Sequence, residues 1–80
     1  MNIIKELSTF NMSNSFRSGM EQLRYVDFPK AKKEIMTVLN ITSRSSWAAR
    51  LKGKVEPKVS EKNVIEQILA KYGVTKNIWG

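Results

Sequence analysis

The residues best suited to chemistry form a short polar and basic run, Thr42-Ser43-Arg44-Ser45-Ser46. Serine and threonine hydroxyls donate and accept hydrogen bonds, and an arginine guanidinium donates in a fixed fork. Further positive charges follow at Arg50, Lys52, Lys54 and Lys58. These residue types can hold phosphate oxygens and polar ring edges. The run therefore indicates non-covalent binding of an anion rather than bond-breaking chemistry.

The composition argues against an enzyme. The chain has 80 residues with no cysteine and no histidine, so it has neither a thiolate metal site nor the commonest general base and metal ligand. Its seven carboxylates are scattered among basic residues, and no Gly-rich phosphate loop is present. We expect no catalytic residue, cofactor, metal site or small-molecule substrate.

The positive charge is concentrated in the middle of the chain. The net charge is +7; residues 1–27 sum to zero and residues 59–80 to +1, whereas residues 28–58 carry +6. Two acidic residues in this basic block are outnumbered by eight basic ones: Lys30, Lys32, Lys33, Arg44, Arg50, Lys52, Lys54 and Lys58. This concentration indicates a face that binds an anionic partner.

Apolar spacing predicts a helix at about 60–72, after which Gly73 and Val74 would form the left-handed stop. Its buried stripe is expected to be Val64, Ile65, Ile68, Leu69 and Tyr72. Ser60 is the expected N-cap, and Glu61 favours the positive end of the helix dipole.

A second helix is predicted over 29–39. Pro29 suits its first turn, Asp27 would cap it, and Asn40 would end it so that Ile41 folds back onto the core. The expected buried stripe is Ala31, Ile35, Val38 and Leu39.

A third helix is predicted at about 44–52, with Trp47 and Leu51 facing inward and Gly53 ending it. Glu56-Pro57 would form a connector, because the residue before proline is pushed out of helical geometry.

The N-terminal third is expected to contribute a helix through Phe16, Met20 and Leu23, and a short helix or frayed lead-in at Ile3, Ile4 and Leu7. Phe16, Tyr25 and Phe28 are assigned to the core. Three placements stay open for Trp79: packing on the C-terminal helix, a contact with a second copy, or solvent.

These elements predict an all-α, compact bundle of four to five short helices in a single domain, 1–80, with residues 1–12 frayed and 75–80 as a tail. No apolar run reaches 18 residues, so no membrane span is expected. The start lacks the pattern of a signal peptide, and we expect a cytoplasmic protein.

The short turn between the helices at 29–39 and 44–52 predicts a helix-turn-helix at about 29–53. Its second helix would enter a DNA major groove. The expected base-reading residues are Arg44, Ser45, Ser46 and Ala49. The expected phosphate-binding residues are Thr42, Ser43, Arg50, Lys52, Lys54, Lys58, Lys30 and Lys33. Either Ser43 or Arg44 could be the first residue of this second helix.

The run from Leu39 to Trp47, then Leu51-Lys52-Gly53-Lys54 and Pro57, resembles the motif of lambda-repressor/Cro-type regulators. Within that group it is most similar to small phage- or mobile-element-type proteins that end in Tyr-Gly-Val and an Ile-Trp-Gly tail. The likeness covers roughly residues 27–80. It departs at Asn40, where glycine is usual, and in a turn one residue longer. The resemblance implies a lambda-repressor-like fold and transcription regulation.

The sequence therefore predicts sequence-specific binding of double-stranded DNA by a transcriptional regulator. Because one recognition helix reads only a few base pairs, a homodimer or tandem binding is compatible with this prediction. The alternative is a protein-interaction module, such as an antitoxin or adaptor, that keeps the fold without binding DNA. A membrane-surface role is disfavoured because the basic residues share no helix face with a large apolar stripe.

Overall fold

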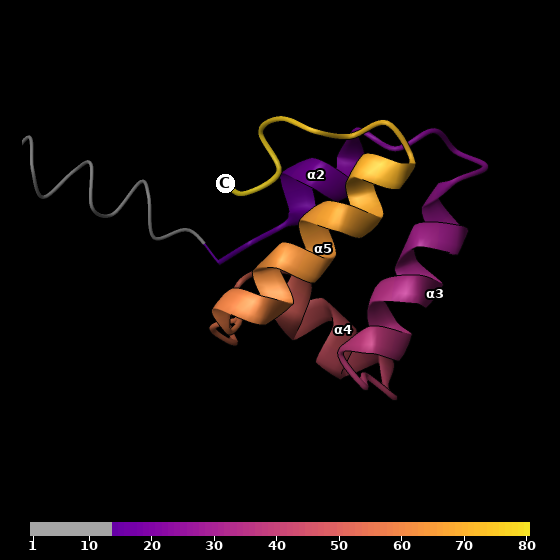
Figure 1. Ribbon diagram of the computed structural model, residues 1–80. Helices are drawn as coiled ribbons and strands as arrows, with labels where there is room; N and C mark the ends of the chain where they lie inside the picture. Colours follow the sequence, from indigo (N-terminus) through magenta and orange to yellow (C-terminus); the bar gives the residue numbers. More distant parts are fainter. Residues whose placement is uncertain (1–13) are drawn as a thin grey trace, which may run out of the picture.

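The computed structural model describes residues 14–80, which form four helices and no strand (Figure 1). The helices are α2 (Arg17–Glu21), α3 (Phe28–Val38), α4 (Arg44–Leu51) and α5 (Val59–Lys71). The prediction of an all-α fold is confirmed. The expected lead-in at 1–12 lies outside the described residues.

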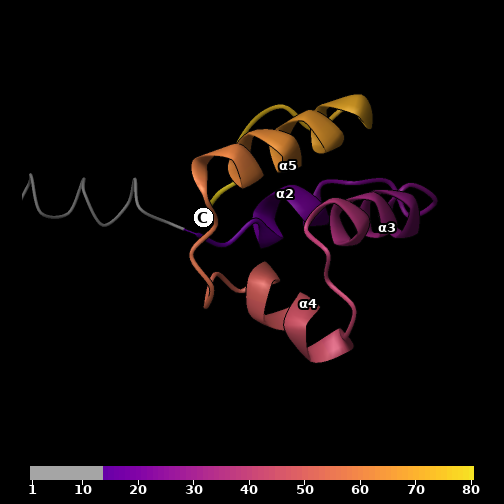
Figure 2. The same ribbon diagram turned by 60° about the horizontal axis from the view of Figure 1, so that its bottom comes forward.

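The two longest helices, α3 and α5, pack side by side and run in opposite directions (Figures 1 and 2). In Figure 2, α5 lies on one side of α2 and α4 on the other, at the rim of the molecule. The core between the helices consists of Phe16, Met20, Ala31, Ile35, Leu39, Ile41, Trp47, Ile65, Ile68, Leu69, Val74 and Ile78.

Three helices end in the same backbone arrangement. A left-handed residue follows α3, α4 and α5: Asn40 (φ 58°), Gly53 (φ 82°) and Gly73 (φ 92°). The next residue donates its N–H to the carbonyl oxygen five residues back: Ile41 to Met36 at 2.8 Å, Lys54 to Ala49 at 2.9 Å and Val74 to Leu69 at 2.9 Å. These Schellman motifs satisfy carbonyl groups that the helix itself leaves open. The three predicted helix ends are confirmed.

The predicted helix starts are less accurate. Asp27 does occupy the N-cap position of α3, but its carboxylate does not cap the helix. It accepts a hydrogen bond from Arg24 Nε at 2.8 Å instead. Ser60 is wrong as the cap of α5, because that helix begins at Val59 after an extended Lys58. Glu61 reaches back and accepts the Lys58 N–H at 2.9 Å, which stabilises the earlier start.

Two apolar assignments are also wrong. Val38 is 53% exposed, because the buried stripe of α3 follows Ala31, Ile35 and Leu39 and leaves Val38 at its edge. Tyr25 is 93% exposed. The helix predicted through Leu23 ends at Glu21, so the connection to α3 carries the Tyr25 ring away from the core.

The C-terminal tail folds back along α2 (Figure 1). Gly19 donates its N–H to the Ile78 carbonyl at 3.1 Å, and Gly80 donates to Ser15 at 3.0 Å. Trp79 Nε1 donates to Glu66 Oε2 of α5 at 2.7 Å. Of the three placements left open for Trp79, the structure therefore shows packing on the C-terminal helix.

Gly53 and Gly73 differ in what surrounds them. A Cβ on Gly53 would lie 2.7 Å from Ser15 N and 2.9 Å from the Asn14 carbonyl carbon, whereas a Cβ on Gly73 would meet nothing within 4 Å. The N-terminal segment therefore crosses directly over the end of α4. Ser15 Oγ donates to the Leu51 carbonyl there, at 2.8 Å.

We predict that G53A lowers the free energy of unfolding more than G73A. Both variants place a side chain at positive φ, which costs about 1 kcal/mol. Only G53A also forces backbone atoms apart, which adds about 1–3 kcal/mol. Urea unfolding followed by far-UV circular dichroism measures both values. Equal losses would contradict the close approach of residues 14–15 to Gly53.

Candidate nucleic-acid interface

Ser43 fixes where α4 begins. Its backbone is extended (φ −131°, ψ 157°), and its Oγ accepts the Ser46 backbone N–H at 3.1 Å. The same hydroxyl donates to Ser46 Oγ at 2.9 Å. Ser43 is therefore the N-cap and Arg44 the first helical residue, which decides between the two registers left open by the sequence.

The start of α4 is open to solvent. All residues from Thr42 to Ser46 are exposed, and they lie at the rim of the molecule (Figure 2). The backbone N–H groups of Arg44 and Ser45 have no acceptor within the helix, because they precede its first internal hydrogen bond. Trp47, one residue beyond this exposed run, is 5% exposed and anchors the helix in the core, as predicted.

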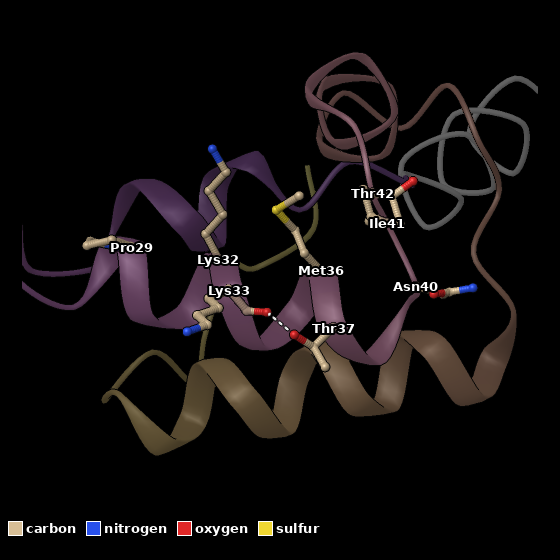
Figure 3. Close-up of a pocket in the computed structure, with 8 residues that line it drawn as sticks. All are labelled: Pro29, Lys32, Lys33, Met36, Thr37, Asn40, Ile41 and Thr42. Atoms are coloured by element: carbon tan, nitrogen blue, oxygen red, sulfur yellow. Dashed lines mark hydrogen bonds between the residues drawn. The ribbon is translucent and has the colours of Figure 1, made fainter.

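Two hollows flank the turn that joins α3 to α4. The first has a volume of about 500 Å³ and lies over α3, where Lys32 and Met36 extend on the same side of the helix (Figure 3). Lys33, Thr37 and Thr42 also line it. The second, of about 310 Å³, lies between the turn and α4. Asn40, Ile41 and Thr42 line both hollows.

The structure brings part of the predicted site together. Thr42, Ser46, Ala49 and Arg50 line the second hollow, while Thr42 and Lys33 share the first. Ala49, one of the expected base-reading residues, is half-buried.

The remaining predicted residues lie elsewhere along the basic block. Arg44 and Ser45 are exposed at the start of α4. Lys52 and Lys54 flank the end of α4, Lys58 precedes α5, and Lys30 lies in the first turn of α3.

Arg50 has a carboxylate partner within the protein. Its Nη1 donates to Glu61 Oε1 at 3.1 Å, and the two side chains are 20% and 22% exposed. The Lys58 backbone N–H and then Arg50 hold the pKa of Glu61 below its usual range. The pair ties the last turn of α4 to the first turn of α5.

Other ion pairs neutralise several of the charges outside the block. Arg17 pairs with Glu21 at 3.0 Å and Arg24 with Asp27 at 2.8 Å. Glu34, although it lies in the block, accepts hydrogen bonds from Lys71 and from the Tyr72 hydroxyl. These donors lower the pKa of Glu34, and the bond to Glu34 raises the pKa of Tyr72.

The ion pairs leave most of the unpaired positive charge in one part of the chain, with Lys76 in the tail as an exception. Within residues 14–80, seven cations of the basic block form no ion pair at contact distance: Lys30, Lys32, Lys33, Arg44, Lys52, Lys54 and Lys58. Lys32 Nζ instead lies 5.5 Å from the centre of the Trp47 ring. The excess charge of the sequence is thus uncompensated around α3, α4 and the start of α5.

Lys32 and Asn40 are residues of this region that sequence reasoning did not place in the site. Lys32 was counted only as charge, and Asn40 only as a helix terminator. The four-residue spacing from Lys32 to Met36 puts both on one side of α3, and this spacing could have indicated the first hollow.

Residues 14–80 contain no group of three or more acidic side chains that could hold a metal ion. Across the same residues, none of the helices has the length and apolar character needed to cross a lipid bilayer. Comparison with known proteins found no matching family model, no matching curated protein and no matching solved structure.

We predict that E61Q lowers the free energy of unfolding by about 1–2 kcal/mol at pH 7, because it weakens the bonds from Lys58 and Arg50. The pKa of Glu61 is lowered in the folded protein, so its stabilisation is complete above the unfolded-state pKa, about 4.3. It is lost as the pH falls through the folded-state pKa. Urea unfolding measures the free energy of unfolding of wild type and of E61Q, and the difference between the two values should therefore shrink below about pH 4.

E56Q is the matched control, because Glu56 is exposed and has no hydrogen-bond partner among residues 14–80. It should show little difference from wild type at any pH. A constant difference between wild type and E61Q from pH 7 to pH 3 would contradict the role given to the Glu61 carboxylate.

Proposed function

We propose that this chain binds double-stranded DNA with sequence specificity, using α3 and α4 as a helix-turn-helix of the lambda-repressor/Cro type. The observation that carries the proposal is that an exposed helix start lies in the same region as seven cations that form no ion pair. On this basis the protein acts as a transcriptional regulator, of the kind found in phages and mobile elements.

The dimensions of α4 support the proposal. The eight residues of α4 give a helix about 12 Å long. With its side chains an α-helix is about 10–12 Å across, which fits a major groove about 12 Å wide. Ser45 and Ser46 are small, so the backbone can approach base edges closely. Their hydroxyls can donate or accept there, and the Ala49 methyl suits a thymine methyl. Arg44 can bind guanine with two hydrogen bonds.

The same arrangement offers phosphate contacts on both sides of the helix. Thr42 and the free N–H groups at the start of α4 suit one phosphate. Lys30 and Lys33 on α3, with Lys52 and Lys54 after α4, can follow the backbone away from it. Arg50 is the exception, because its ion pair with Glu61 gives it the role of orienting α4.

We predict a steep salt dependence for binding to a random 20-base-pair duplex. If about five phosphates are neutralised, log K falls against log[salt] with a slope of about −4 to −5. Fluorescence anisotropy of a labelled duplex between about 50 and 200 mM salt measures the slope. A slope near zero would contradict the proposal and favour the protein-interaction module.

Two single-charge variants test whether the salt dependence comes from the basic block. K54A removes a cation of the basic block and should reduce the slope by about one. K76A is the control, because Lys76 is also exposed and has no carboxylate partner among residues 14–80, but lies in the tail. It should leave the slope unchanged. Equal effects of the two variants would show only a general charge effect.

For base reading, we predict that selection from a random duplex pool enriches one motif. R44A should then weaken binding to that motif by about 1–3 kcal/mol. It should also reduce the difference in affinity between the motif and random DNA. Competition titrations with motif and random duplexes measure both affinities. If R44A weakens both duplexes equally, Arg44 contacts phosphate and does not read a base.

A further inference from the structure

Two consecutive residues, Ser15 and Phe16, lie between the C-terminal tail and α4. We call this pair of residues the bridge. The Ser15 carbonyl accepts the Gly80 N–H of the tail at 3.0 Å, and the Ser15 hydroxyl donates to the Leu51 carbonyl at 2.8 Å. The polar contacts of the bridge therefore connect the tail with the last residue of α4.

The aromatic ring of the bridge makes the same connection a second time. The Phe16 ring meets Trp47 of α4 and Trp79 of the tail edge-on, with centroids 5.5 and 6.0 Å apart. The Trp79 ring is itself held in place, because its Nε1 donates to Glu66 Oε2 at 2.7 Å and Lys62 Nζ lies 4.9 Å from its centre. The tail therefore limits the positions that the Phe16 ring can take against α4.

We propose that Trp79 is a positioning residue that sets the sequence specificity of DNA binding through α4. Its ring holds Phe16 against Trp47, and Phe16 in turn limits how α4 can tilt. Trp79 does not itself reach the DNA, because it binds α5, which lies on the opposite side of α2 from α4 (Figure 2). The inference rests on the proposed function and extends it to a residue outside the basic block.

The way α4 is anchored makes it sensitive to this contact. Of its eight residues, Trp47 alone is buried. A helix held by one side chain can pivot about it unless neighbouring groups restrain the movement. The Phe16 ring restrains the anchor itself, while the bond from the bridge to Leu51 and the Arg50–Glu61 pair restrain the end of the helix.

A small tilt of α4 affects base reading more than phosphate binding. Ser45 and Ser46 are short, so their hydrogen bonds to base edges require the helix backbone at a fixed place. Lysine side chains are long and flexible point charges, which follow a phosphate through a small shift. Lys30 and Lys33, moreover, belong to α3, which packs on α5. The loss of the Trp79 ring should therefore lower specificity and leave the affinity for random DNA nearly unchanged.

Three variants of the full chain test this inference. W79A removes the ring that contacts Phe16. W79F keeps a ring there and removes only the indole N–H, so it should restore most of the wild-type behaviour. I35V is the control for stability, because Ile35 is fully buried in α3 and lies outside the bridge, the tail and α4. Far-UV circular dichroism checks that each variant is folded at the temperature of the titrations.

Competition titrations with the selected motif and a random duplex measure the ratio of the two affinities. W79A should lower this ratio about tenfold, the effect of losing one base contact, and should leave the salt slope unchanged. I35V should leave the ratio unchanged, because partial unfolding lowers both affinities by the same factor. A wild-type ratio in W79A overturns the inference, and so does an equal fall in W79A and I35V.

Nuclear magnetic resonance of the same variants without DNA separates the inference from the proposed function. W79A should move the amide signals of α4 more than those of α3, whereas I35V should do the reverse. If the α4 signals of W79A stay in place, Trp79 does not position α4 and the inference is overturned, even if the affinity ratio falls. If they move but no motif is selected, the proposed function fails and the role in specificity fails with it, while the hold of Trp79 on α4 stands.

Discussion

The position of α4 depends on the Phe16 side chain, which is 1% exposed. Its ring meets Trp47 of α4 edge-on, with centroids 5.5 Å apart, and meets Trp79 of the tail in the same way at 6.0 Å. Aromatic pairs in this geometry contribute attraction beyond the area they bury. One residue before α2 therefore connects the α4 helix with the end of the chain.

The polar contacts reinforce this arrangement from the outside. The Ser15 hydroxyl binds the Leu51 carbonyl near the end of α4, and Arg50 pairs with Glu61 at the start of α5. A short helix of eight residues is marginal by itself, so α4 keeps its orientation through these neighbours. The exposed residues 42–46 are thus presented by a helix that is fixed on its inner side.

Much of the fold could be predicted from local patterns. The ends of α3, α4 and α5 were predictable because Asn40, Gly53 and Gly73 are residue types that tolerate the left-handed backbone. The starts were harder, because the Asp27 carboxylate binds Arg24 and does not cap α3, and because Glu61 accepts the Lys58 N–H so that α5 begins before Ser60. Tyr25 was misplaced because apolar character alone does not show where a helix stops. The contact of residues 14–15 with Gly53 depends on packing between distant segments, which no local pattern shows.

The candidate site was also predictable only in part. Charge counting located the basic block, and the turn residues located α4. The partner of Arg50 was not predictable, because Glu61 lies eleven residues away on another helix. The burial of Ala49 likewise depends on how the connecting turn lies against α4.

The two tryptophans lie in different surroundings, and this has a spectroscopic consequence. Trp47 is buried in the core, whereas Trp79 is half-buried, with its ring 4.9 Å from Lys62 Nζ and its indole N–H bound to Glu66. The indole emission of Trp79 therefore responds when the tail leaves α5, while that of Trp47 responds when the core opens. Replacing either ring with phenylalanine separates the two signals, so local release of the tail can be timed against global unfolding without an attached dye.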